Sequence, residues 1–104
     1  MQSNNAIEIG MFKLKAQVSI EQATAAYQNM VDHFLSKQIA WQGQSLILLE
    51  DGTLIDLAWA QNIEAAKSIC NLWMENSNCL AFLALIEPIS MQFGQVLVQR
   101  PLAS

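Results

Sequence analysis

The spacing of apolar residues changes along the chain, and this change constrains the fold more than any other sequence feature. Residues 6–14, 41–49, 53–60 and 89–98 show the alternation or the Leu- and Ile-rich composition of β-strands. Residues 20–37 and 62–76 instead carry apolar side chains every three or four positions, which is typical of helices with one buried face. In the first helix this stripe is Ile20, Ala23, Tyr27, Met30, Val31 and Phe34. A short apolar segment, residues 78–86, predicts an extra helical turn before the last strand. The predicted order is therefore strand, helix, strand, strand, helix, strand.

Capping residues mark where the helices begin. Ser19 precedes the first helix, and Gln22 three positions later completes a capping box. Asn62 is the predicted N-cap of the second helix, whose buried stripe is Ile63, Ala66, Cys70, Trp73 and Met74. Asn78 is the predicted cap of the short third helix. We expect Pro88 to end that helix, because the residue before a proline is disfavoured in the helical region.

The segment Glu50-Asp51-Gly52 connects the two central strands and leaves two registers open. If all three residues form the loop, a type I turn is followed by a left-handed glycine; if only Asp51-Gly52 do, the turn is a two-residue primed turn. We favour the three-residue loop, because it places Ile47 and Leu49 on one face with Ile55, Leu57 and Trp59. The alternative register brings Asp56 onto that apolar face.

This order of elements predicts an α+β, ferredoxin-like βαββαβ fold with an antiparallel four-stranded sheet and both main helices on one face. We expect the helices to cover the face that carries Ile7, Ile9, Met11, Ile55 and Trp59. The other face is then open to a second copy of the chain, and the two facing sheets enclose a cavity. Its predicted residues are Glu8, Gly10, Phe12, Leu14, Gln42, Gln44, Leu46, Leu48, Leu54, Asp56, Ala58, Ser90, Gln92, Gly94, Val96 and Val98.

Length and composition set further bounds. The 104 residues suffice for one domain, residues 1–104, and 53% hydrophobic against 13% charged residues indicates surface that a homodimer would bury. A net charge of −4 argues against nucleic acid as a partner. The longest apolar run, residues 79–86, is far shorter than the ~18 residues of a membrane span, and no signal-peptide pattern precedes residue 6, so we expect a cytoplasmic protein with its two cysteines as thiols.

Several short stretches resemble those of the dimeric α/β-barrel superfamily, and within it the antibiotic-biosynthesis-monooxygenase-like group. The resemblance extends over about residues 6–97 and implies a homodimer whose sheets face each other as a barrel. Some members are cofactor-independent oxygenases of aromatic polyketides, others degrade haem, and others have no known substrate. The stretches are Ile7-Glu8-Ile9, Phe12-Lys13-Leu14-Lys15, Asp51-Gly52-Thr53 with Asp56 and Trp59, the Ala-rich second helix, Ser77-Asn78-Cys79 with Phe82, and Ile86-Glu87-Pro88.

The haem-degrading members need an axial histidine after the second helix, where this chain has Leu80-Ala81-Phe82-Leu83-Ala84-Leu85. His33, the only histidine, flanks the apolar stripe of the first helix, as expected of a solvated residue. The sequence has no phosphate-binding loop, no nucleophile elbow and no metal-ligand spacing. We therefore expect no cofactor and no metal.

Glu8 and Asp56 are the candidate catalytic residues. A carboxylate buried between two sheets has a raised pKa and can act as a general base, which a phenolic or enolic substrate needs before dioxygen accepts an electron. Alternatively, both are hydrogen-bonded to glutamines or the partner chain and only fix the register of the sheets. The candidate ligand-binding residues are Phe12, Gln42, Gln44, Gln92 and Trp59, the last either at the cavity mouth or packed against the helices.

Two functions from different classes remain open. One is a cofactor-independent monooxygenase acting on a small aromatic or polyketide-like molecule in the barrel cavity. The other is a non-catalytic homodimer that binds a small apolar ligand or serves as an interaction module.

Overall fold

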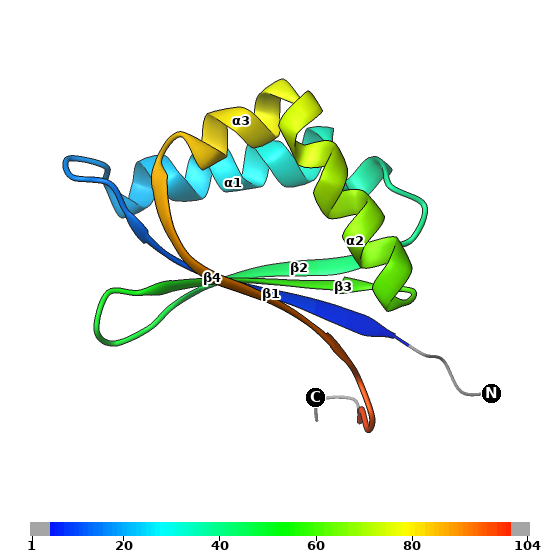
Figure 1. Cartoon of the computed structure of the whole chain (residues 1–104). Coiled ribbons are helices and arrows are strands. Elements are labelled where there is room, and N and C mark those ends of the chain that lie inside the picture. Colours follow the sequence, from blue (N-terminus) through cyan, green and yellow to red (C-terminus); the bar gives the residue numbers. More distant parts are fainter. Residues whose placement is uncertain (1–4, 101–104) are drawn as a thin grey trace.

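The computed structural model describes residues 5–100 and has the predicted order of elements (Figure 1). The elements are β1 (Ala6–Leu14), α1 (Ile20–His33), η1 (Leu35–Lys37), β2 (Trp41–Leu48), β3 (Leu54–Ala60), α2 (Ile63–Leu72), η2 (Trp73–Glu75), α3 (Ser77–Leu83) and β4 (Ile86–Gln95), of which η1 and η2 are single 3-10 turns.

The four strands form one antiparallel sheet in the order β2-β3-β1-β4. All three α-helices lie on the same side of this sheet (Figure 1). The α+β, ferredoxin-like prediction is therefore confirmed, whereas dimerisation into a barrel stays a prediction. None of the helices in residues 5–100 is both long and apolar enough to cross a membrane.

Two of the three predicted helix caps are confirmed. The Ser19 side chain accepts a hydrogen bond from the Gln22 backbone N–H at 3.0 Å, and that of Asn62 accepts one from Ala65 at 2.8 Å. The cap of α3 is Asn76 and not Asn78, because the Asn76 side chain binds the backbone N–H groups of both Asn78 and Cys79.

The hairpin between β2 and β3 has the three-residue loop. The Leu49 N–H donates to the Thr53 carbonyl at 2.8 Å, and Gly52 has a φ of +91°, the left-handed conformation that favours glycine. Ile47 lies opposite Ile55, so the predicted register is confirmed.

The prediction of which sheet face the helices cover is wrong. The helices cover the face with Glu8, Phe12, Leu54 and Asp56, all of which are buried within one chain. Phe12 meets Phe82 of α3 edge-on, with ring centroids 5.6 Å apart, in a core with these members: Tyr27, Met30, Phe34, Leu35, Leu54, Ile69, Trp73, Cys79 and Ile86. The opposite, uncovered face is defined by Ile7, Ile9, Met11, Ser45, Ile47, Ile55, Leu57 and Trp59.

The last strand begins three residues before the predicted start. β4 includes Pro88, which an edge strand tolerates because its unpaired side needs no N–H donor. A register shift between Met11 and Phe12 accompanies it. As a result Gln92 pairs with Ile9, on the uncovered face, and the helix-side position beside Gly10 belongs to Met91.

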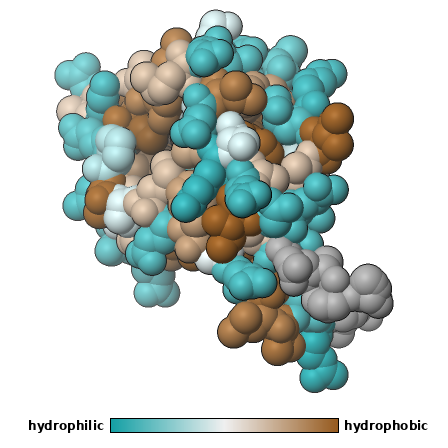
Figure 2. Space-filling view, turned by 45° about the vertical axis from the view of Figure 1, so that its right-hand side comes forward, coloured by the Kyte–Doolittle hydropathy of each residue, from teal (hydrophilic) through white to brown (hydrophobic). Residues whose placement is uncertain are grey.

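Apolar side chains remain exposed on the described part of a single chain, and Figure 2 shows them scattered among polar ones. Met74, predicted to be buried, is 67% exposed because α2 tightens into η2 at Trp73 and turns Met74 outward. Leu97 and Val98 after β4 are also exposed.

Candidate functional site

A pocket of about 220 Å³ lies between the sheet and the second and third helices. Most of its lining is apolar, and the lining includes the exposed Met74 and Met91. It is lined by Glu8, Gly10, Met11, Phe12, Asp56, Cys70, Trp73, Met74, Phe82, Leu83, Ile86, Pro88, Ser90 and Met91. We call it the inner pocket.

Two carboxyl groups, Glu8 of β1 and Asp56 of β3, line the inner pocket. Asp56 lies opposite Gly10 in the strand pairing, so Glu8 and Asp56 are diagonal neighbours on one face, with Cα atoms about 7–8 Å apart in such a pair. They are only 5% and 6% exposed. Two strands that are adjacent in the sheet but distant in sequence therefore bring two acids into one apolar site.

Burial changes the acid strength of both groups. Burial, together with the charge of Asp56, raises the pKa of Glu8 to about 7. Burial also raises the pKa of Asp56, to about 6, although hydrogen bonds from Tyr27 and Gln44 oppose the rise. Near neutral pH, Asp56 is mostly ionised and Glu8 exchanges its proton readily, so the pair offers a base and an acid.

Asp56 is held by residues from two other elements. The Tyr27 hydroxyl on α1 donates to Asp56 Oδ1 at 2.5 Å, and the Gln44 side-chain amide on β2 donates to the same oxygen. Trp41 Nε1 in turn donates to Gln44 Oε1 at 3.0 Å. These hydrogen bonds make a chain from Trp41 through Gln44 to the carboxylate.

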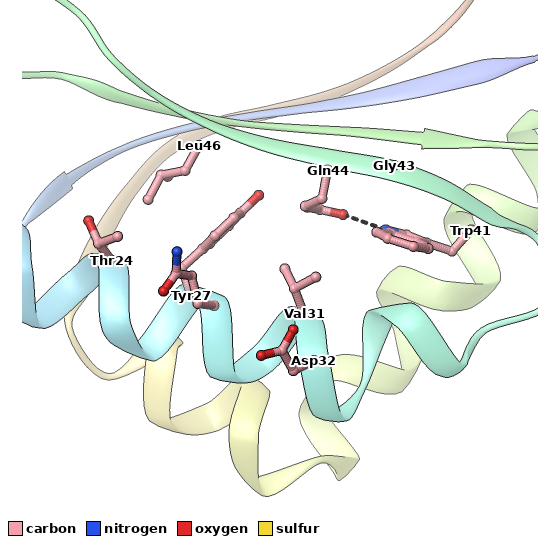
Figure 3. Close-up of a pocket in the computed structure, with 9 residues that line it drawn as sticks. Thr24, Tyr27, Val31, Asp32, Trp41, Gly43, Gln44 and Leu46 are labelled. Atoms are coloured by element: carbon pink, nitrogen blue, oxygen red, sulfur yellow. Dashed lines mark hydrogen bonds between the residues drawn. The ribbon is translucent and has the colours of Figure 1, made fainter.

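Tyr27, Gln44 and Trp41 also line a second, open hollow of about 780 Å³ between α1 and β2, which we call the outer groove (Figure 3). Asp56 lines the inner pocket and is absent from the outer groove's lining. Tyr27 and Gln44 therefore stand between the outer groove and the buried acid.

Trp73 lines the inner pocket and is 8% exposed. Its Nε1–H is buried and has no hydrogen-bond partner among the described residues. A buried donor without a partner costs free energy, so Trp73 contributes to the site through its aromatic surface at the expense of one unsatisfied donor.

The thiol of Cys70 is a poor nucleophile. Burial and the neighbouring Glu8 raise its pKa to about 12, so it stays protonated, and its Sγ donates to Met91 Sδ at 3.7 Å. Cys70 and Cys79 are both free thiols, as predicted. His33 is exposed at the end of α1 and contacts the Asn29 carbonyl, as expected of a solvated histidine.

The structure brings four of the seven candidate site residues to the helix side of the sheet and separates the other three. Glu8, Phe12 and Asp56 line the inner pocket, although it lies under the helices and not between two sheets. Gln44 binds Asp56. Trp59 pairs with Ile7 and lies on the uncovered face, so the prediction that it packs against the helices is wrong, while a place at the mouth of a cavity between two sheets stays a prediction.

Gln42 and Gln92 lie elsewhere because each strand is irregular. Gln42 is the extra residue of a bulge between Trp41 and Gly43 and is exposed. Gln92 is exposed opposite Ile9. In contrast, Tyr27 and Trp73 belong to the site but were assigned only to buried helix stripes. A hydroxyl or indole N–H in such a stripe needs a partner, which was the available signal.

No metal site is apparent in residues 5–100, where no three His, Cys, Asp or Glu side chains cluster closely enough to hold an ion. Function without metal or cofactor stays a prediction.

No protein-family model matches this chain. No curated protein matches it either. Several solved structures, in contrast, are similar to this chain. SnoaB, a cofactor-independent oxygenase from Streptomyces nogalater, is similar with a TM-score of 0.66 and 11% identity, covering 98% of this chain and 100% of SnoaB.

Two further solved structures are similar over most of their length. A candidate antibiotic biosynthesis monooxygenase from Nitrosomonas europaea has a TM-score of 0.70 and 12% identity, over 93% of this chain and 94% of that one. A candidate monooxygenase from Shewanella loihica has a TM-score of 0.68 and 17% identity, over 95% of this chain and 100% of that one. The chain therefore has the fold of the antibiotic-biosynthesis-monooxygenase-like proteins, as the sequence resemblance implied.

Proposed function

We propose that this protein is a cofactor-independent monooxygenase that oxidises a small phenolic or enolic aromatic molecule in the inner pocket. The observation that carries the proposal is the pair of buried carboxyl groups, Glu8 and Asp56, with pKa values of about 7 and about 6 in one apolar pocket. The similarity to SnoaB, a cofactor-independent oxygenase, supports it.

The chemistry needs only a base, an acid and dioxygen. Asp56 removes a proton from the substrate, and the resulting carbanion gives one electron to dioxygen; the substrate radical and superoxide then combine into a peroxide anion, which takes a proton from Glu8 to become a hydroperoxide. The ionised Glu8 removes the remaining proton from the same carbon as the O–O bond breaks, and the protonated Asp56 gives its proton to the leaving hydroxide, so that a carbonyl group and water form and both acids return to their starting states. One oxygen atom enters the product and the other leaves as water, so no external reductant is consumed.

The size and lining of the inner pocket restrict the substrate. About 220 Å³ is below the roughly 300–1,000 Å³ of drug-sized ligand sites, which favours a small, flat molecule of two or three fused rings. Phe12, Phe82 and Trp73 supply aromatic surfaces for such a ring.

Oxygen uptake tests the proposal with 1-naphthol and anthrone, each of which would give a quinone and one water per dioxygen. We expect the metal-free protein to form quinone and Asp56→Asn to lose this activity. The matched control is Asp51→Asn, at an exposed carboxyl in the hairpin loop. Equal rates for the wild type, Asp56→Asn and buffer alone with both compounds would contradict the proposal.

A second candidate, a non-catalytic module for a small apolar ligand, is favoured by the largely apolar lining of the inner pocket. It predicts that 1-naphthol binds equally well to the wild type and to Asp56→Asn and is recovered unchanged. The same experiment therefore separates the two functions. A cytoplasmic location accords with either function and stays a prediction.

The uncovered face supports our further proposal that the protein is a homodimer. It presents a continuous row of apolar side chains, including Ile9, Leu57 and Trp59, that no element of the described chain covers. Large apolar faces of this kind are typical of homodimer interfaces.

A further inference from the structure

The two oxygens of the Asp56 carboxyl group have different surroundings. Oδ1 accepts hydrogen bonds from both the Tyr27 hydroxyl and the Gln44 amide. Oδ2 accepts none from the residues that the structure describes. The Tyr27 oxygen also lies 3.1 Å from the Ser45 carbonyl, but its one hydrogen serves the shorter contact to Asp56.

Trp41 determines which end of the Gln44 amide faces Asp56. An indole Nε1–H can only donate, so the group that faces Trp41 must be the amide oxygen of Gln44 (Figure 3). The amide NH₂ group therefore faces Asp56, where it can only donate. This orientation favours the carboxylate form of Asp56 over the protonated form.

The same three residues separate Asp56 from the outer groove. Tyr27, Gln44 and Trp41 line the outer groove. Tyr27 and Gln44 bind Oδ1 directly, and Trp41 acts on it through its hydrogen bond to Gln44. The two oxygens of a carboxylate diverge from its planar carbon and point in different directions. Oδ1 is bound by residues of the groove side, and Asp56 lines the inner pocket, so Oδ2 is the oxygen available to that pocket.

We infer that Tyr27, Gln44 and Trp41 are positioning residues that fix Oδ1 of Asp56 and leave Oδ2 as the oxygen that takes the substrate proton. This inference rests on the proposed function, in which Asp56 is the base. A carboxylate with one oxygen held in place presents the free lone pairs of its other oxygen in one direction. A proton acceptor fixed in this way needs no reorientation when the substrate arrives.

The ionisable groups that face Asp56 determine how its pKa responds to a substitution. They are Glu8 on β1, Tyr27 on α1 and Cys70 on α2, and no cationic side chain of the described chain contributes to the pKa of either acid. The two hydrogen-bond donors are therefore what offsets the burial of the Asp56 charge. Removing either donor disfavours the carboxylate.

The direct test is a ¹³C NMR titration of the side-chain carboxyl groups in the full chain. A hydrogen bond to a charged group is strong enough that we expect Gln44→Leu and Tyr27→Phe each to raise the pKa of Asp56 by about 1 to 2 pH units. Trp41→Phe should raise it less, because Gln44 remains but loses its fixed orientation. Gln42→Leu, an exposed amide on the same strand, is the matched control and should leave it unchanged.

A second readout distinguishes loss of these hydrogen bonds from a general disturbance of the site. The charge of Asp56 raises the pKa of Glu8, so keeping Asp56 protonated to higher pH should lower the pKa of Glu8. The two acids then shift in opposite directions in Gln44→Leu. Loosened packing that admits water would lower both values.

Failure of the inference and failure of the proposed function give different results. An unchanged or lowered pKa of Asp56 in both Gln44→Leu and Tyr27→Phe would overturn the inference, whatever the activity. If Tyr27→Phe does not fold, Gln44→Leu alone decides by the same criterion. A raised pKa of Asp56 in a protein that oxidises neither 1-naphthol nor anthrone would support the positioning role and contradict the oxygenase.

Discussion

The stability of the protein should fall as the pH rises from 4 to 7, and Glu8→Gln should remove part of this fall. Glu8 has a pKa of about 7 in the folded chain against an ordinary value of 4.5. The folded state therefore prefers the protonated acid. Its contribution to stability is complete below pH 4.5 and is lost as the pH rises through the folded-state pKa of about 7.

The size of the effect follows from the pKa values. A rise from 4.5 to about 7 corresponds to about 3 kcal/mol lost from the free energy of unfolding between pH 4 and pH 8. Asp56, whose pKa rises from 3.8 to about 6, adds a loss of similar size that is complete at a lower pH. Gln has nearly the same shape as protonated Glu but never ionises, so Glu8→Gln should match the wild type at pH 4 and exceed it by up to about 3 kcal/mol at pH 8.

Urea denaturation at pH 4, 5, 6, 7 and 8 measures this directly, at one protein concentration because a dimer's stability depends on it. Glu50→Gln, at an exposed acid of the hairpin loop, is the matched control and should parallel the wild type. The reasoning is refuted if wild-type stability is constant or rises from pH 4 to 7. It is also refuted if Glu8→Gln differs from the wild type by the same amount at every pH.

Two further variants test the uncovered face and the inner pocket. Leu57→Arg places a charge at the centre of the uncovered face and should convert a dimer into monomers at micromolar concentration, as measured by analytical ultracentrifugation, whereas Gln42→Arg should not. A wild type that is already monomeric would contradict the homodimer. Trp73→Ala removes an aromatic wall of the inner pocket and should weaken 1-naphthol binding roughly tenfold in calorimetric titration; unchanged affinity would show that Trp73 does not contact the ligand.

Local chemistry made the helix starts and the hairpin predictable. Ser19 and Asn62 can each satisfy a free N–H of the next helical turn from within four residues, so neither cap depends on the rest of the fold. Gly52 likewise identifies the hairpin, because the left-handed position of the loop requires a residue without a side chain. Asn76, and not the predicted Asn78, caps the third helix, and only the backbone conformation distinguishes the two residues.

Alternation predicted which residues share a face but not which face the helices cover. Glu8 and Asp56 seemed too polar to lie beneath helices, because a buried carboxyl group is costly without partners. The partners of Asp56 are Tyr27 and Gln44, which lie 29 and 12 positions away in the sequence. A local sequence pattern does not reveal such a contact. The sequence therefore identified the two acids as site residues but did not show on which side of the sheet the site lies.

The predicted positions of Gln42 and Gln92 were wrong because β2 and β4 are irregular. Bulges at Gln42 in β2 and at Ile89 in β4 each change the face on which the residues beyond them lie, and counting alternate residues assumes that there is no bulge. Pro88 added to the error at β4, because it reads as the end of an element and is in fact part of an edge strand. Counting is reliable for β1 and β3, at the centre of the sheet.

The helices cover the face of the sheet that carries Glu8 and Asp56, and this changes how the site relates to a dimer interface. A cavity between two sheets would have made every substitution at Glu8 or Asp56 a change in the dimer interface as well. In the observed arrangement Glu8, Tyr27, Asp56 and Trp73 come from β1, α1, β3 and η2 of one chain, on the side of the sheet away from the uncovered face. The proposed chemistry and the proposed pairing thus use opposite faces of one sheet. An interface on the uncovered face would lose or gain apolar contacts without moving the acids, and exchange of the acids would place no charge in that interface.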